Sequence, residues 1–205
     1  MDDTVSDIPS IDTNFFITVS GPPGCGATSL CTRLSAAMDC PYVSGGEIFR
    51  EVAEDREMSL TQLSAKAQAS DDIDRALDER LRTIAETWGT ADKPFILESR
   101  LAGWLAGGHA DLRIYLDAPE EVRKVRISDR EETVAEMSVR EVNEAGRYRS
   151  YYDLDLENRT FYDLHINTAR WSKQGVFELV RTAIEAYDPE NDEGPFATPS
   201  VEFEA

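Results

Sequence analysis

The sequence contains few cysteines and histidines, and their spacing indicates neither a metal site nor a disulfide framework. The 3 cysteines, Cys25, Cys31 and Cys40, are odd in number and lack the C-x-x-C spacing that is typical of zinc sites. Cys25 lies near an expected helix N-terminus, a position that lowers the pKa of a thiol. We interpret Cys25 as a small packing residue, with a redox role as the alternative.

Long apolar runs are also absent. No stretch approaches the roughly 20 apolar residues that a membrane-spanning helix needs. The first residues, MDDTVSDIPSIDTN, are acidic and lack the basic-then-apolar order of a signal peptide. Both observations argue against a membrane or secreted protein and favour a cytoplasmic one.

Positive charge is scarce as well. The chain has 40 acidic and 21 basic residues, a net charge of −19, and only four of the basic residues are lysines. Such a surface repels nucleic-acid backbones and anionic membranes, so we expect neither as a partner. Self-repulsion is tolerated where salt screens it, since the Debye length in 1 M salt is about 3 Å. The composition favours a halophilic source, the alternative being an acidic protein from a non-halophilic organism.

What the chain does have is a glycine-rich stretch, SGPPGCGATS, directly after a β-favouring run at residues 15–19. Gly21, Gly26 and Thr28 match the P-loop pattern G-x-x-x-x-G-K-[ST]. In that pattern backbone N–H groups and the N-terminus of the next helix surround a phosphate group. Ala27 stands where the pattern has lysine. The stretch predicts a phosphate site, with a ligand-free Gly/Pro-rich turn as the alternative.

Strand-like and helix-like segments alternate along the rest of the chain. The expected strands are 15–19, 41–43, 95–97, 112–116 and 164–166; the expected helices are 28–38, 48–56, 59–68, 71–87, one after Pro119, 131–152 and 172–187. This alternation predicts an α/β fold with a parallel sheet between two helical layers. Ligands in such folds bind beyond the carboxyl ends of the strands, which here carry residues 20–28, 98–100, 117 and 167–169.

Two capping-box patterns support the helix assignments between residues 44 and 90. Ser44 is followed three residues later by Glu47, and Ser59 is followed three residues later by Gln62. In a capping box the serine side chain and the acidic or amide side chain each bind a backbone N–H at the helix start. Helices are therefore expected to begin near both serines.

Arginines follow the expected strands at positions where phosphate groups would need positive charge. Arg50 and Arg100 lie with Asp74 and Asp78 in the half of the chain that would hold an acceptor. A second set lies where a closing flap would need positive charge: Arg126, Arg130, Arg140 and Arg147. Guanidinium groups bind phosphate oxygens in pairs and stay charged at any working pH. Salt bridging on helix surfaces is the alternative for each arginine taken alone.

Taken together, the motifs resemble the archaeal-type cytidylate kinases of the nucleoside monophosphate kinase group. The resemblance covers about residues 14–187 and rests on SGPPGCGAT, VSGGEIFRE, IDRALDER, LESRLAGWLA, YLDAPEEVR, REVNEAGRY and YDLHINTARW. The final segments resemble haloarchaeal members in particular. The resemblance implies a P-loop NTPase fold, with a helical monophosphate-binding segment at about 44–90 and a helical lid at about 126–152. An acidic arm at 1–13 and a disordered acidic tail at 188–205 would lie outside this single domain.

The resemblance also implies the reaction and its residues. A monomer would transfer the γ-phosphoryl group of ATP, with Mg²⁺, to CMP or dCMP in pyrimidine nucleotide metabolism. ATP would contact Gly21, Pro22, Pro23, Gly24, Cys25, Gly26, Ala27, Thr28, Ser29, Arg126, Asn167 and Thr168, with Thr28 on the metal. The monophosphate would contact Ser44, Arg50, Asp74, Asp78, Glu98 and Arg100. The catalytic residues would be Arg126, Arg130, Arg140 and Arg147.

Ala27 is the departure from the family pattern that bears on activity. A charge-assisted hydrogen bond contributes roughly 1.5–3 kcal/mol. Losing one that acts on the transition state costs about 10²–10³ in turnover, by analogy with oxyanion-hole deletions. Three functions follow as alternatives: a cytidylate kinase with a reduced rate, a silent nucleotide-binding paralogue with a regulatory role, and a kinase for a different small acceptor.

Overall fold

The computed structural model describes residues 8–69, 72–127, 146, 148–188 and 190–191 of the 205-residue chain. Five strands form one parallel sheet in the order β2-β3-β1-β4-β5. The strands are β1 (Phe16–Ser20), β2 (Tyr42–Ser44), β3 (Phe95–Glu98), β4 (Leu112–Asp117) and β5 (Leu164–Asn167). All five predicted strands are confirmed within one or two residues at each end. The strand order reverses direction at β1, which places β1 at the switch point where ligands bind in open α/β sheets.

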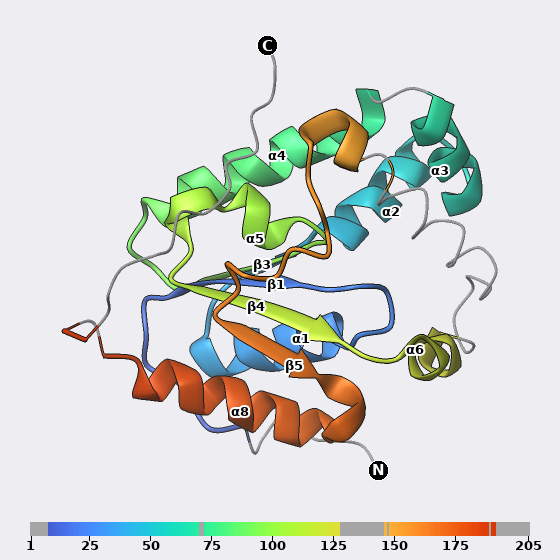
Figure 1. Cartoon of the computed structure of the whole chain (residues 1–205). Helices are drawn as coiled ribbons and strands as arrows, with labels where there is room; N and C mark the ends of the chain where they lie inside the picture. Colours follow the sequence, from blue (N-terminus) through green and yellow to red (C-terminus); the bar gives the residue numbers. More distant parts are fainter. Residues whose placement is uncertain (1–7, 70–71, 128–145, 147, 189, 192–205) are drawn as a thin grey trace.

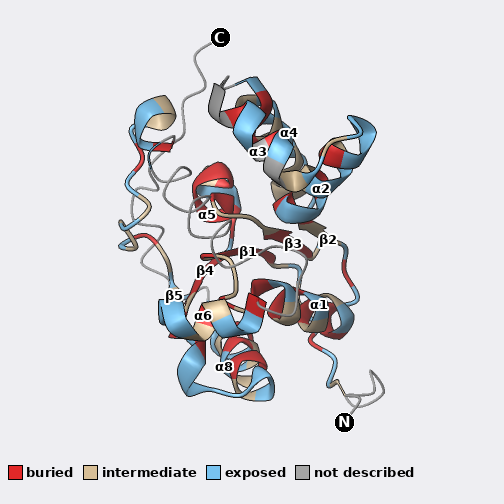
Figure 2. Cartoon of the chain, turned by 90° about the vertical axis from the view of Figure 1, so that its right-hand side faces the viewer, coloured by how far each residue is buried: buried red, intermediate tan, exposed pale blue. Residues whose placement is uncertain are grey.

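Helices cover both faces of the sheet, as Figures 1 and 2 show. The α-helices are α1 (Ala27–Met38), α2 (Gly45–Asp55), α3 (Leu60–Ala69), α4 (Asp72–Gly89), α5 (Ala102–Leu105), α6 (Glu120–Ile127) and α8 (Lys173–Ala186). The described residues also include the short 3₁₀ helices η2 (Gly107–His109) and η3 (Thr168–Arg170). Helices α1 and α8 pack on one face, and α4 and α5 lie over the other. The three-layer α/β fold is therefore confirmed, whereas the short helix α5 was not predicted.

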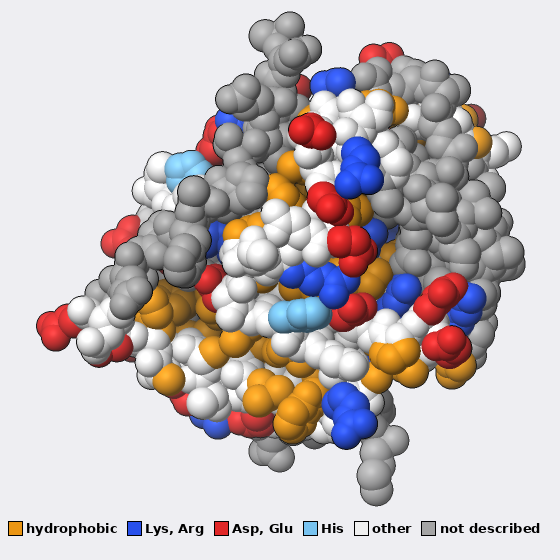
Figure 3. Space-filling model, in the orientation of Figure 1, with side chains coloured by type: hydrophobic (Ala, Val, Ile, Leu, Met, Phe, Trp, Pro, Cys, Tyr) orange, Lys and Arg blue, Asp and Glu red, His pale blue; other side chains and the backbone are white. Residues whose placement is uncertain are grey.

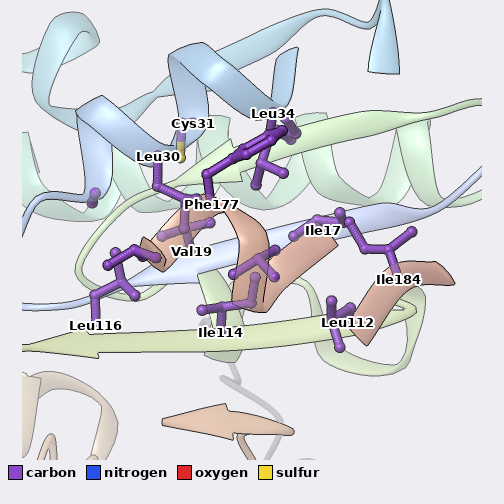
Figure 4. Close-up of a cluster of buried hydrophobic side chains, with 14 of the residues drawn as sticks. Ile17, Val19, Leu30, Cys31, Leu34, Leu112, Ile114, Leu116, Phe177 and Ile184 are labelled. Carbon is purple, nitrogen blue, oxygen red and sulfur yellow. The ribbon is translucent and has the colours of Figure 1, made fainter. Parts of the chain in front are cut away.

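The core is divided by the sheet because successive strand residues point to opposite faces. Figure 4 shows the cluster on the α1/α8 face, where Ile17 and Val19 of β1 lie among side chains from β4, α1 and α8. Phe16 and Phe95 point to the other face and pack with the α4 and α5 layer. All five residues of β1 are buried, as expected for a central strand covered on both sides. This double burial fixes the position of the strand that leads into the glycine-rich stretch.

Helices begin at both serines, and the contacts described complete one of the two capping boxes. The Ser44 hydroxyl accepts a hydrogen bond from the Glu47 N–H at 3.4 Å, at the start of α2. At α3 the exchange is reciprocal: the Gln62 N–H donates to Ser59 Oγ at 3.1 Å, and the Ser59 N–H donates to Gln62 Oε1 at 2.9 Å. These bonds satisfy backbone donors that a helix start otherwise leaves without partners.

The ends of the chain differ in part from expectation. The predicted loose arm at residues 1–13 is in contact with the core from Ile8 onward, and Ile11 is buried. The Ile11 N–H donates to the Ala37 carbonyl at 2.8 Å, so an apolar residue and a backbone bond hold this segment against α1. Most of the predicted helix at 131–152 and most of the predicted tail at 188–205 lie outside the described residues. Within the former range, residues 146 and 148–152 are helical.

Charged side chains are dispersed over the visible surface. On the face that Figure 3 shows, acidic and basic side chains are interspersed among hydrophobic and uncharged ones. No helix of the described part of the chain is long and apolar enough to span a membrane.

Candidate active site

The glycine-rich stretch forms a tight loop between β1 and α1, and close approach of other backbone requires glycine at two of its positions. A Cβ atom at Gly21 would lie 2.2 Å from the Leu116 carbonyl oxygen of β4. A Cβ atom at Gly24, whose φ is +79°, would lie 2.9 Å from the Arg123 carbonyl oxygen of α6. A side chain at either position would push the loop away from the sheet or from α6.

The loop ends at the N-terminus of α1, which has the features of an anion site. Gly26 precedes the helix with φ +100°, and no side chain caps this start among the residues described. The first backbone N–H groups of α1 are therefore not covered by a capping side chain, and the helix dipole adds positive potential there. Thr28 is exposed at the second helical position. The arrangement suits a phosphate group and a hydroxyl ligand for its counter-ion.

Ala27, at the first position of α1, places a methyl group where the P-loop pattern has an ammonium group. It is 8% exposed, packs with the core on the α1/α8 face and lines the cavity described below. The site is thus a P-loop in backbone shape that lacks one of the pattern's positive charges.

Side chains from α6 and η3 hold the loop from outside. Arg123 is buried and donates to the Ala118 carbonyl from Nε and to the Pro23 carbonyl from Nη1, both at 3.1 Å. The Thr168 hydroxyl donates to the Cys25 carbonyl at 2.7 Å. Two of these bonds end on backbone carbonyls of the loop, those of Pro23 and Cys25, and the Cys25 N–H donates to the Pro22 carbonyl within the loop at 3.1 Å.

Arg126 joins the same two elements. Its Nη1 donates to Thr168 Oγ1 at 2.9 Å and to the Gly24 carbonyl at 3.1 Å, and its Nη2 donates to the Thr168 carbonyl at 3.1 Å. Asn167 caps η3 by accepting from the Ala169 N–H at 3.1 Å. The predicted set Arg126, Asn167 and Thr168 therefore lies together, against the loop.

A cavity of about 400 Å³ lies at the carboxyl ends of β1, β2 and β3. The glycine loop, from Gly21 to Ser29, lines one part of it. The other part is lined by all six residues predicted to contact a monophosphate, namely Ser44, Arg50, Asp74, Asp78, Glu98 and Arg100. One cavity therefore joins the phosphate loop to groups from β2, α2, α4 and β3 that are far from it in sequence.

The α4 wall of the cavity combines buried carboxylates with apolar side chains. Asp74 and Asp78 are 5% and 3% exposed, one helical turn apart, and Leu77 and Leu81 line the same wall. The Tyr152 hydroxyl donates to Asp78 Oδ2 at 3.1 Å. Such a wall suits a flat, partly apolar ligand that carries hydrogen-bond donors.

Two tyrosines that sequence reasoning missed bind carboxylates of this site. The Tyr42 hydroxyl donates to Glu98 Oε2 at 2.7 Å, and burial together with the Glu98 charge raises the pKa of Tyr42. Burial and the Asp78 charge likewise raise the pKa of Tyr152. Both hydroxyls therefore stay protonated as donors across the physiological pH range. Neither pairing had a sequence signal, because the partners are 56 and 74 residues apart.

The alternative of a redox-active Cys25 is wrong, and its interpretation as a packing residue is confirmed. Cys25 is 2% exposed, and burial raises the pKa of its thiol to about 12. The loss of solvation outweighs the helix N-terminus because the side chain points into the core on the α1/α8 face. Cys25 is thus a packing residue, as the first interpretation had it.

The remaining predicted residues are not placed by the structure. Arg130, Arg140 and Arg147 lie outside the described residues. In the part of the chain that the structure does describe, no three His, Cys, Asp or Glu side chains are grouped to hold a metal ion.

Known proteins are similar to this chain in sequence or in fold. A family described as an AAA domain matches residues 17–149. The cytidylate kinases of Haloquadratum walsbyi and Natronomonas pharaonis are each 46% identical over 193 residues, which cover 92% of this chain and 98% of each relative. The shikimate kinase of Bacteroides thetaiotaomicron has a similar fold, with a TM-score of 0.56 and 12% identity over 83% of this chain and 98% of its own.

Proposed function

This chain belongs to the cytidylate kinase family, and from that premise we propose how its residues transfer the γ-phosphoryl group of ATP to CMP. It is a phosphotransferase of the nucleoside monophosphate kinase type, and the resemblance read from its motifs is confirmed. The assignment of residues to donor and acceptor is supported by one observation: the glycine loop and the six residues proposed for the acceptor line the same cavity. A shared cavity allows the donor and acceptor phosphates to meet, and phosphoryl transfer depends chiefly on such positioning.

The donor side is proposed to hold the ATP phosphates. Residues 21–29 would surround them with backbone N–H groups, since the loop carbonyls are already bound to Arg123, Arg126 and Thr168. The Thr28 hydroxyl would bind Mg²⁺, which neutralises charge that develops on the transferred group. Arg126, Asn167 and Thr168 would lie at the nucleoside end of ATP.

The acceptor side is proposed to hold CMP or dCMP. Ser44, Arg50 and Arg100 would bind its phosphate group, because guanidinium groups match phosphate oxygens. Asp74 and Asp78 would accept hydrogen bonds from the nucleoside. The exocyclic amino group of cytosine is such a donor, whereas uracil presents a carbonyl oxygen at that position, which a carboxylate repels. Glu98, held by Tyr42, would complete this side.

Catalysis is proposed to depend on arginines rather than on a P-loop lysine. Arg126 lies beside the loop, and Arg130, Arg140 and Arg147 would reach the transferred group from a lid at about 126–152. With Ala27 in place, we expect transfer at a reduced rate.

The organisation of the chain is proposed accordingly. Residues 14–187 would form one kinase domain, with residues 8–13 packed against its core, the monophosphate-binding segment at about 44–90 and the acidic residues 188–205 outside it. The protein would act as a cytoplasmic monomer in pyrimidine nucleotide metabolism, without nucleic acid or membrane partners. A halophilic archaeal source fits both the net charge of −19 and the haloarchaeal relatives.

The test is a coupled assay of ADP release with CMP, dCMP, UMP and AMP in high KCl. We expect ATP turnover that depends on CMP or dCMP and is much weaker with UMP and AMP. No CMP-dependent turnover at micromolar enzyme would contradict the kinase. Calorimetry on the same samples then separates a silent nucleotide-binding protein, which binds CMP without turnover, from one that accepts another monophosphate.

A further inference from the structure

The Tyr152 hydroxyl binds a buried carboxylate on the α4 wall of the cavity. The hydroxyl donates to Asp78 Oδ2 at 3.1 Å, and Asp78 is 3% exposed on α4. Tyr152 itself does not line the cavity, whereas Asp78 does. The Tyr152 hydroxyl can therefore act on a ligand of the cavity through Asp78.

The backbone around Tyr152 is firmly placed. The helical residues 148–152 end at Asp153, whose φ of +52° gives a left-handed turn, and the Asp153 N–H donates to the Arg149 carbonyl at 3.1 Å. Leu154 follows and is buried in the core with Trp104 and Phe161. The residues on the C-terminal side of Tyr152 thus anchor it to the α4/α5 face of the sheet.

The ring of Tyr152 is held from two sides. It lies nearly parallel to the Tyr148 ring, with centroids 6.4 Å apart, and Tyr148 lines the cavity. The Arg75 guanidinium of α4 lies 5.6 Å from the Tyr152 ring centroid and 5.3 Å from that of Tyr151. With backbone and ring both fixed, the hydroxyl is directed at Asp78 before any ligand binds.

We propose that Tyr152 is a positioning residue that fixes the orientation of the Asp78 carboxylate and thereby sets the selectivity of the acceptor site for cytosine over uracil. The inference rests on the proposed function, in which Asp78 accepts a hydrogen bond from the nucleoside. A carboxylate recognises an amino group only when one of its oxygens points along the donor direction. The Tyr152 bond to Oδ2 restrains the rotation that would turn the other oxygen away.

The direct test replaces the hydroxyl alone. Tyr152→Phe keeps the ring, its stacking on Tyr148 and its contact with Arg75. Because the Asp78 carboxylate then loses the bond that orients it, we expect the KM and Kd for CMP to rise about tenfold. The KM for ATP should stay close to that of the unsubstituted protein, and the ratio of CMP to UMP affinity should fall about tenfold.

Tyr151→Phe is the matched control. It removes a hydroxyl from the next residue of the same helix, whose ring also lies beside Arg75. We expect its KM for CMP and its CMP-to-UMP ratio to equal those of the unsubstituted protein. An equal loss in both variants would overturn the proposal, because it would indicate a general effect of tyrosine hydroxyls on this helix.

A double-mutant cycle shows whether the hydroxyl acts through the carboxylate. In an Asp78→Asn background, Tyr152→Phe should change CMP affinity by less than about twofold. A full tenfold effect in that background, or no effect in the unsubstituted protein, would overturn the proposal. The unsubstituted protein separates the two hypotheses: if it binds no CMP, the proposed function and this inference both fail, whereas normal CMP binding with an unchanged Tyr152→Phe variant refutes the inference alone.

Discussion

At the scale of single residues, the side chain at position 27 should determine the kcat of phosphoryl transfer. Its methyl group lines the cavity next to the loop N–H groups, so a longer side chain has space to extend toward bound phosphates. We predict that Ala27→Lys raises kcat by about 10²–10³, because it restores one charge-assisted hydrogen bond to the transferred group. Steady-state ADP release with saturating CMP measures the change.

The control for this prediction adds the same charge one turn away. Thr32 is exposed on α1, where its hydroxyl donates to the Thr28 carbonyl, and it does not line the cavity. Thr32→Lys should leave kcat within about twofold of the unsubstituted value. A similar kcat in Ala27→Lys and Thr32→Lys would show that a lysine at position 27 supplies no specific stabilisation.

The three cysteines give a second prediction at the same scale. Burial raises the pKa of Cys25 to about 12 and that of Cys40 to about 11, and it also raises the pKa of Cys31. At pH 8 the thiolate fraction of Cys25 is then about one part in ten thousand, and the thiolate is the reactive form. We expect no alkylation by iodoacetamide in the folded protein at pH 8 and three modified cysteines after unfolding, as counted by mass spectrometry. Rapid modification of Cys25 in the folded state would contradict its burial.

At the scale of elements, the glycine loop depends on the segment that follows β5. Thr168 is 4% exposed, and its hydroxyl donates to the Cys25 carbonyl. Thr168→Val keeps the shape of the side chain but removes the shorter of the two hydrogen bonds to that carbonyl, the other coming from Arg126 Nη1 at 3.5 Å, at a cost of about 0.5–1.5 kcal/mol. We predict a rise of about tenfold in the KM for ATP with little change in the KM for CMP.

An exposed threonine provides the comparison for Thr168. Thr160 bonds only within its own turn, to Asn158, among the contacts described. Thr160→Val should leave both KM values unchanged. If Thr168→Val lowers the melting temperature but not the affinity for ATP, the contact stabilises the fold without shaping the loop.

The sequence predicted which helices and strands form, but it predicted the contacts between them only in part. Apolar runs and the two serine capping boxes located the strands and the starts of α2 and α3, because these signals are local. Parallel strands gather their carboxyl ends at one edge, which was enough to bring Arg100 and the glycine loop to one cavity. The bonds Tyr42–Glu98 and Tyr152–Asp78 depend on how separate helices and strands dock, and no local pattern encodes that. The same holds for Cys25, whose burial is set by the packing of α1 and α8 on the sheet.

At the scale of the whole molecule, the net charge of −19 opposes folding, because compaction brings like charges together. Most ion pairs of the described residues involve exposed side chains, as between Arg82 and Glu86 or Lys124 and Glu120, and such pairs contribute little each. Screening by salt should therefore stabilise this protein more than pairing does, since the Debye length falls from about 10 Å at 0.1 M to about 3 Å at 1 M.

We predict that the melting temperature rises by about 5 °C or more between 0.1 M and 2 M KCl, given that 1 kcal/mol corresponds to roughly 2–4 °C for a chain of this size. Differential scanning calorimetry measures the shift, and choline chloride at equal ionic strength is the control for screening by any monovalent salt. Equal gains in both salts identify screening as the cause, because choline cannot replace a small cation bound between carboxylates. A melting temperature that is flat or falls with KCl would mean that the acidic surface imposes no repulsion on the folded state, and that packing of the two core layers alone sets the stability.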